Sequence, residues 1–207
     1  MTRLILIRHG ETDFNLQNRY CGFSDPPLNS KGIEQSEKLA AELEAIGVDK
    51  VYASDLKRAY ETAAIIFKGN SIEKTENFRE MNFGIFEGLK YEEIVQRYSK
   101  FYRDWIDNPL KVQIPKGEGV RDLSKRVKGR LYSIISRYKD RTIAVVTHGG
   151  PIRVILCDAL KYGLDMFWQI EQNIGALNII EYSKKLEPHI VKVNDTSPLS
   201  IKEGSLL

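Results

Sequence analysis

The chain has 207 residues, of which 42% are hydrophobic and 29% are charged, as is usual for a globular protein. This composition excludes collagen-like, coiled-coil and disordered chains, and the length suits one domain with a sizeable core. The net charge of +3 is too small to indicate a nucleic-acid partner. Cys21 and Cys157 form no C-x-x-C pair, and no apolar stretch approaches the roughly 18 residues of a membrane span. We therefore expect a cytoplasmic protein with reduced thiols and no membrane partner.

Strands and helices alternate along the first half of the chain. Each predicted strand is a short apolar run, and the predicted helices carry capping residues or end near a glycine. In chain order, we expect a strand at residues 4–7, a turn at 24–29, a helix between the N-cap residue (Asn29 or Ser30) and Gly47, a strand at 51–54, a helix at 55–67 and an irregular segment at 70–90.

The second half continues this alternation. Apolar residues recur at helical spacings of three and four across 120–134, which predicts the most regular amphipathic helix of the chain. In chain order, we expect helices at 91–105 and 120–134, a strand at 143–146, a helix from Pro151 to about Leu160 and strands at 176–182 and 189–193. The alternation predicts an α/β fold with a largely parallel sheet, followed by a flexible tail at 197–207.

Two of the three histidines follow the two clearest apolar strands. His9 follows the first strand and His148 the strand at 143–146, and each precedes a glycine that lets another group approach the backbone. In open α/β sheets, ligands bind outside the carboxyl ends of the strands. Both histidines therefore stand where a site is expected. The alternative is that they are incidental, and Arg8, which adjoins His9, argues against it.

Arginine indicates the class of ligand. Arg58 begins a helix that follows a strand, so we expect it at the same edge as Arg8, and a guanidinium fork suits phosphate oxygens. Two histidines and two arginines together indicate a phosphate pocket rather than a metal site. The alternative for Arg58 is a solvated residue paired with Glu61 or Asp55. Glu80, in a segment of mixed polarity, is either a general acid or a surface charge.

Four motifs, in order, resemble those of the histidine phosphatase superfamily, which includes the phosphoglycerate mutases. They are RHGET at 8–12 with Asn15 and LNSKG at 28–32, SDLKRA at 54–59 with TA at 62–63, REMNFG at 79–84 with FEG at 86–88, and THGG at 147–150. The resemblance covers residue 3 to about residue 160. It implies a three-layer α/β/α fold like that of phosphoglycerate mutase, in a single domain at 1–196.

The resemblance also implies a set of roles. His9 is the expected nucleophile, its other ring nitrogen held by a backbone carbonyl for which Gly10 is the candidate. Arg8, Arg58 and His148 would surround the phosphoryl oxygens, while Glu80 would protonate the leaving alcohol and then deprotonate the attacking water. The implied substrate-binding residues are Arg8, Asn15, Cys21, Gly22, Arg58, Glu80, His148 and Gly149. No metal or cofactor is expected.

The segment after Glu80 is short, which resembles the phosphatases rather than the longer metabolic mutases. Trp105 with Pro109, PKGEG at 115–119 and NDTS at 194–197 resemble the α-ribazole-5′-phosphate phosphatases of cobalamin biosynthesis. We therefore expect hydrolysis of a small phosphomonoester, with α-ribazole 5′-phosphate as the first candidate. A broad-specificity phosphatase, a phosphoglycerate mutase and a non-catalytic binding protein are the alternatives, and a homo-oligomer is left open. The aromatic residues at 91–105 either roof the pocket or form the core face of a helix.

Overall fold

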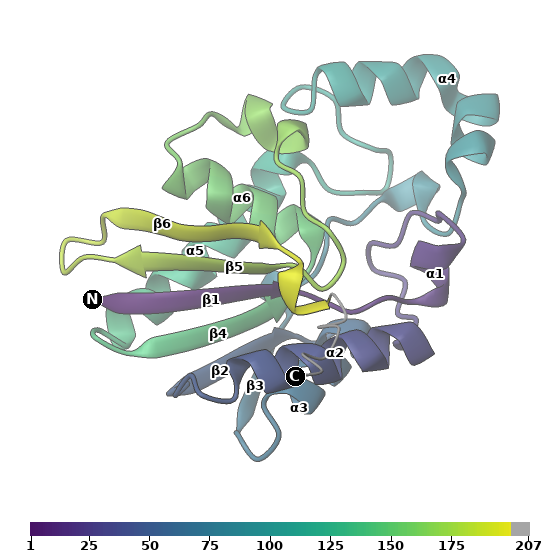
Figure 1. The fold of residues 1–207 in the computed structure, drawn as a ribbon. Helices are drawn as coiled ribbons and strands as arrows, with labels where there is room; N and C mark the ends of the chain where they lie inside the picture. Colours follow the sequence, from purple (N-terminus) through teal and green to yellow (C-terminus); the bar gives the residue numbers. More distant parts are fainter. Residues whose placement is uncertain (200–207) are drawn as a thin grey trace.

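The computed structural model describes residues 1–199, which fold around a central six-stranded sheet (Figure 1). The strands are β1 (Thr2–Arg8), β2 (Lys50–Ser54), β3 (Ile72–Thr75), β4 (Thr142–Thr147), β5 (Leu177–Tyr182) and β6 (Pro188–Asp195). Their order is β3-β2-β4-β1-β5-β6. The first four strands of that order pair in parallel, whereas β5 runs antiparallel to both of its neighbours. The largely parallel sheet expected from the sequence is confirmed.

Helices cover both faces of the sheet (Figure 1). They are α1 (Asp13–Leu16), α2 (Ser30–Leu43), α3 (Lys57–Ile66), α4 (Tyr91–Asp107), α5 (Val120–Arg137) and α6 (Gly149–Ala159). The pair α2 and α3 packs on one face, and the pair α5 and α6 packs on the other. The three-layer α/β/α architecture is confirmed.

The central strands divide the core between these two faces, because side chains alternate along a strand. Leu4 and Leu6 of β1 pack with the α5 and α6 side of the core, whereas Ile5 and Ile7 pack with the α2 and α3 side. β4 alternates in the same way. Burial on both faces explains why these strands are uninterrupted apolar runs in the sequence. The parallel pairing of β1 with β4, in which Arg8 is in register with Thr147, places the carboxyl ends of these strands side by side.

Several short elements are not predicted by the sequence, among them β3, α1 and a 3-10 helix after α6. The edge strand β3 lies within the segment 70–90, which was expected to be irregular. Its central residues Glu73 and Lys74 are exposed, so the strand shows no apolar run in the sequence. The helix α1 and the 3-10 helix η3 (Leu164–Gln169) are too short to show a helical period. Both lie in loops near the carboxyl edge of the sheet.

Several helix ends differ by one to three residues from those expected, and two of these differences change the role of a named residue. α2 stops at Leu43, so Gly47 is not its C′ residue, and the loop beyond it carries Ile46 and Val48 back onto the core. α6 begins at Gly149, which makes Pro151 its third residue rather than its first. A proline is tolerated there because the first N–H groups of a helix have no partner within it.

The chain returns to α2 at the end of the described region. Ser197–Leu199 form the 3-10 helix η4, and Leu199 packs against the α2 side of the core. Nζ of Lys38 donates to the carbonyl of Leu199 at 3.2 Å. The remainder of the expected tail, residues 200–207, lies outside the described residues.

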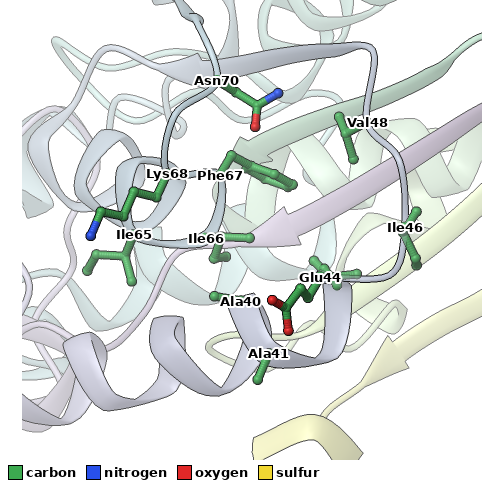
Figure 2. A pocket seen from close by; sticks show the side chains of 11 residues that line it. Ala40, Ala41, Glu44, Ile46, Val48, Ile65, Ile66, Phe67, Lys68 and Asn70 are labelled. Carbon is green, nitrogen blue, oxygen red and sulfur yellow. The ribbon is translucent and has the colours of Figure 1, made fainter.

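A cavity of about 420 Å³ opens between the C-terminal ends of α2 and α3 (Figure 2). Ile46, Val48 and Phe67 give it an apolar lining, beside the charged Glu44 and Lys68. It adjoins the loop that enters β2 at the amino end of that strand, so it is separate from the edge that carries the two histidines. None of the helices within residues 1–199 is long and apolar enough to span a membrane.

Candidate active site

β1 and β4 bring His9 and His148 to one edge of the sheet. Arg8 is in register with Thr147, and the N–H of His9 donates to the carbonyl of Thr147 at 3.0 Å. The imidazole rings of His9 and His148 meet edge to face, with their centroids 5.0 Å apart. The expectation that the two strand ends meet is confirmed.

One ring nitrogen of His9 is committed to the backbone. Nδ1 lies 2.7 Å from the carbonyl oxygen of Gly10, and because a carbonyl only accepts, Nδ1 carries the proton. Burial lowers the pKa of His9 well below its ordinary value, and the cations of Arg58 and Arg8 lower it further. The imidazole is therefore neutral and keeps an electron pair on Nε2, as an attacking nitrogen requires.

Arg58 joins this nitrogen to a neighbouring loop. The side chain is fully buried, and its Nε donates to Nε2 of His9 at 3.3 Å. Its terminal nitrogen atoms donate to the carbonyls of Ser24 at 2.7 Å and Gly22 at 2.8 Å, with a longer contact to Cys21 at 3.3 Å. The alternative of a solvated Arg58 is wrong.

Two buried polar atoms beside His9 have no partner within residues 1–199. They are Nδ1 of His148 and Nε of Arg8. The other ring nitrogen of His148 lies 2.8 Å from Oγ of Ser54, at the end of β2. Burial holds the pKa of His148 well below its ordinary value and lowers that of Arg8 to about 10, so Arg8 stays charged at neutral pH. Unpaired buried groups are rare, and oxygens of a bound ligand would satisfy these two.

Glu80 reaches the same edge from the loop before the 3-10 helix η2 (Gly84–Phe86), and it is 8% exposed. Its two oxygens accept the N–H of Gly150 at 3.0 and 3.1 Å, and Oε1 also accepts the N–H of Met81 at 2.8 Å. Gly150 is the second residue of α6, so the carboxyl group of Glu80 lies at the N-terminus of that helix. The alternative that Glu80 is a surface charge is wrong.

Arg126 of α5 holds the backbone around Glu80. Its terminal nitrogen atoms donate to the carbonyls of Asn77 at 2.9 Å, Arg79 at 2.8 Å and Glu80 at 2.8 Å. Glu118 accepts from the same guanidinium at 2.6 and 2.8 Å. One side chain therefore fixes an irregular loop, a role that the sequence analysis does not identify.

Glu87 does the same for the loop at 21–24. Its carboxylate accepts the N–H of Gly22 at 3.1 Å and of Phe23 at 2.8 Å, and the hydroxyl of Ser24 at 2.8 Å. The N–H of Gly22, one of the predicted substrate-binding residues, is thus used within the protein. Its carbonyl holds Arg58, so Gly22 positions that arginine.

A cavity of about 270 Å³ opens beside His9 and Glu80. Six of the predicted residues line it: Arg8, His9, Asn15, Cys21, Glu80 and Gly149. Gly22, Arg58 and His148 do not line it. Arg58 and His148 contact His9, and Gly22 contacts Arg58. Burial raises the pKa of the Cys21 thiol to about 11, which leaves it protonated at neutral pH. Within residues 1–199, no cluster of three or more His, Cys, Asp or Glu is placed to hold a metal ion.

The sequence model of histidine phosphatase superfamily branch 1 matches residues 4–196. The chain belongs to this superfamily. It is 34% identical over 201 residues to phosphoserine phosphatase 1 of Hydrogenobacter thermophilus, covering 96% of this chain and 95% of that one. It is 28% identical to the adenosylcobalamin/α-ribazole phosphatase of Escherichia coli, covering 88% and 91%. Bacillus stearothermophilus YhfR superposes with a TM-score of 0.91 at 30% identity, covering 97% and 100%. The protein is a phosphomonoester hydrolase.

The cavity of this histidine phosphatase has six further lining residues that the sequence analysis missed: Asn18, Arg19, Tyr20, Phe83, Arg153 and Trp168. Most of them stand in loops or in η3, where no periodic pattern places a side chain. Arg153 is the exception, because it stands four residues after Gly149 on α6 and so on the same helix face. Helical spacing from the last motif could have identified it.

The aromatic residues of α4 do not line the cavity of the phosphatase. Trp105 is 1% exposed and belongs to the core. Its ring lies 6.3 Å from that of Tyr20, 6.2 Å from Phe83 and 4.9 Å from Trp168, measured between centroids. Trp105 therefore forms part of the core face of α4, as the core interpretation predicts, and it packs against the three aromatic side chains that line the cavity. Tyr91, at the start of the same helix, is half exposed.

Proposed function

We propose that this histidine phosphatase forms a phosphohistidine at His9 and then hydrolyses it, with Glu80 acting first as acid and then as base. The observation that carries the proposal is the bond between Nδ1 of His9 and the carbonyl of Gly10. It leaves the electron pair of a neutral imidazole on Nε2, while His9 and Glu80 line the same cavity. A nucleophile and a proton donor then share one space.

In the first step, Nε2 of His9 gives up the hydrogen bond from Arg58, and its electron pair forms a bond to phosphorus as the bond from phosphorus to the ester oxygen breaks. The protonated carboxyl of Glu80 gives its proton to that oxygen, so the product leaves as an alcohol. In the second step, the Glu80 carboxylate takes a proton from water, whose oxygen bonds to phosphorus as the bond to nitrogen breaks. His9 returns to its neutral form and phosphate is released.

Negative charge spreads over the phosphoryl oxygens in both transition states. Arg8 supplies a permanent cation with an unpaired Nε, and His148 an unpaired Nδ1, while Arg58 fixes Nε2 of His9. Oδ1 of Asn15 accepts from the backbone and hydroxyl of Thr12, which orients its amide nitrogen as a neutral donor. These groups stabilise the charge without the reorganisation that water would require.

α-Ribazole 5′-phosphate is the first candidate substrate. The similarity to the E. coli enzyme supports it, and so do Tyr20, Phe83 and Trp168, whose rings suit a flat heterocycle. Phosphoserine is the second candidate, supported by the 34% identity to a phosphoserine phosphatase over nearly the whole length of both chains.

The test of the mechanism is hydrolysis of p-nitrophenyl phosphate in the presence of EDTA. We expect turnover by the wild type, none by His9→Ala, and an acid-labile phosphate on the peptide that contains His9 after rapid quenching. Full turnover by His9→Ala would overturn the phosphohistidine. The substrate is then tested by comparing kcat/KM for α-ribazole 5′-phosphate, phosphoserine, 3-phosphoglycerate and sugar phosphates. Transfer of phosphate between positions of 3-phosphoglycerate, without its release, would instead indicate a mutase.

A further inference from the structure

Arg153 is a cation that the proposed phosphoryl chemistry does not use. It extends from α6 to the wall of the cavity, and its Nε donates to the carbonyl of Ile170 at 2.8 Å. The guanidinium carbon lies 5.8 Å from the ring centroid of Phe167 and 5.6 Å from that of Trp168. One backbone bond and two aromatic rings therefore hold the head group in place.

Among residues 1–199, the hydrogen bond of Nε to Ile170 is the one hydrogen bond that Arg153 makes, and its terminal nitrogen atoms form no ion pair. Burial lowers the pKa of Arg153, and the nearby Glu80 opposes this shift. The side chain nevertheless stays charged at neutral pH. An unpaired and partly buried cation on a cavity wall is a site for an anion, because an unpaired charge is costly to bury.

Arg153 stands beside the proposed acid. A Cβ atom built on Gly149 would lie 3.5 Å from Nη1 of Arg153, 3.7 Å from Cζ of Arg8 and 3.7 Å from Oε2 of Glu80. The three side chains therefore meet over the first residue of α6. In the proposed reaction, Arg8 binds the phosphoryl group and Glu80 protonates the ester oxygen. Arg153 therefore faces the part of the substrate that lies beyond that oxygen.

The lining as a whole carries more positive than negative charge. Its charged residues are Arg8, Arg19, Arg153 and Glu80. Arg19 has a carboxylate of its own, that of Glu93 at 3.8 Å. Once a phosphoryl group has bound Arg8, Arg153 is the cation of this lining that remains without an anion.

We propose that Arg153 forms a subsite for a carboxylate carried by the leaving group, so that the substrates are short phosphorylated hydroxy acids or amino acids. The inference rests on the proposed function, because it takes the phosphoryl group to lie between His9 and Arg8. Trp168 would contact the carbon chain between the two anionic groups. α-Ribazole 5′-phosphate, the first candidate above, has no carboxylate for this subsite, so the inference favours the second candidate, phosphoserine.

The test compares two substrates that differ only in this group, 3-phosphoglycerate and glycerol 3-phosphate. We expect the wild type to prefer 3-phosphoglycerate about tenfold or more in kcat/KM, the effect of one charge-assisted hydrogen bond. Arg153→Gln should abolish this preference, and Arg153→Lys should retain part of it because it keeps the charge. The matched control is Arg141→Gln, an exposed arginine that pairs with Asp49 at the amino edge of the sheet, and it should keep the wild-type ratio.

Binding is measured in parallel by calorimetry on the His9→Ala protein, which needs no turnover. Tighter binding of 3-phosphoglycerate than of glycerol 3-phosphate, lost in the double variant with Arg153→Gln, supports the subsite. Equal use of the two substrates by the wild type would overturn it. So would a loss of kcat/KM in Arg153→Gln that is the same for both, since Arg153 would then act on Glu80. A binding preference without hydrolysis would keep the subsite and overturn the proposed function.

Discussion

Nε of Arg58 lies 3.3 Å from Nε2 of His9, so a permanent cation donates to the nitrogen that we propose as nucleophile. The contact favours the neutral imidazole, because Nε2 can accept this N–H only while it carries no proton. It also links the nucleophile to the loop at 21–24, because the other nitrogen atoms of the same guanidinium hold the carbonyls of that loop. Position and charge at His9 thus depend on one side chain.

Arg58→Lys should therefore lower kcat/KM for p-nitrophenyl phosphate by about a hundredfold or more, which is the usual cost of losing one preorganised donor. Lysine keeps the charge but cannot hold His9, Ser24 and Gly22 at once. Thermal unfolding checks that the variant is folded. Activity within a few-fold of the wild type in a folded variant would contradict this role.

Glu80→Gln should affect substrates according to their leaving group. An alkyl phosphate needs a proton on the departing oxygen, so its kcat/KM should fall by about 10² to 10⁴. p-Nitrophenolate leaves readily without a proton, so formation of the phosphoenzyme from that ester should fall less. The measurement is the rate constant of the p-nitrophenol burst beside kcat/KM for the two esters, because both report formation of the phosphoenzyme and not its hydrolysis. An equal loss for both would show that Glu80 has no role as an acid.

Gly22→Ala should reduce both stability and activity. A Cβ atom there would lie 2.2 Å from the carbonyl oxygen of Met81 and 2.2 Å from Oε1 of Glu87. The loop must move, at a cost of about 1–3 kcal/mol, and the move withdraws a carbonyl from Arg58. Gly47→Ala is the matched control, since a Cβ atom there meets nothing within 4 Å. Urea unfolding and kcat/KM are measured for both, and identical behaviour of the two variants would refute the argument.

The stability of the protein should fall between about pH 6.5 and pH 5 in a way that depends on His148. Burial, followed by Arg58, holds the pKa of His148 well below its ordinary value, so it stays neutral in the folded protein while the unfolded chain takes up a proton. The free energy of unfolding then drops by about 1.4 kcal/mol per pH unit for each such histidine. His148→Asn should have a slope that is shallower by about this amount in urea unfolding at several pH values. Equal slopes would contradict the prediction.

The sequence allowed the central strands and the groups at their ends to be predicted, because these follow from local patterns. Uninterrupted apolar runs mark strands that are buried on both faces, and His9 and His148 follow two of them. The place of Glu80 in the site was implied by the motif resemblance, since nothing in its loop shows that its carboxylate will accept the N–H of Gly150. Helix ends were less certain, as α2 and α6 show, because capping contacts and core packing decide them.

The side chains that hold the loops could not be predicted. Glu87 accepts hydrogen bonds from the backbone of a segment far away in the chain, and Arg126 donates hydrogen bonds to another such segment. Backbone groups are nearly the same in every residue, so the sequence does not show which of them a side chain will bind. Trp168 reaches the cavity from η3, a turn too short for periodicity to reveal. Such contacts depend on tertiary packing alone.

The residues at the cavity are held in place by two different kinds of structure. His9 and His148 end strands that are fixed by a ladder of hydrogen bonds inside the core, whereas Arg19 and Trp168 come from a loop and a 3-10 helix outside the sheet. After a gene duplication, substitutions at such positions would change the groups that meet the substrate and leave that ladder intact. The reaction can therefore be inherited while its substrate diverges.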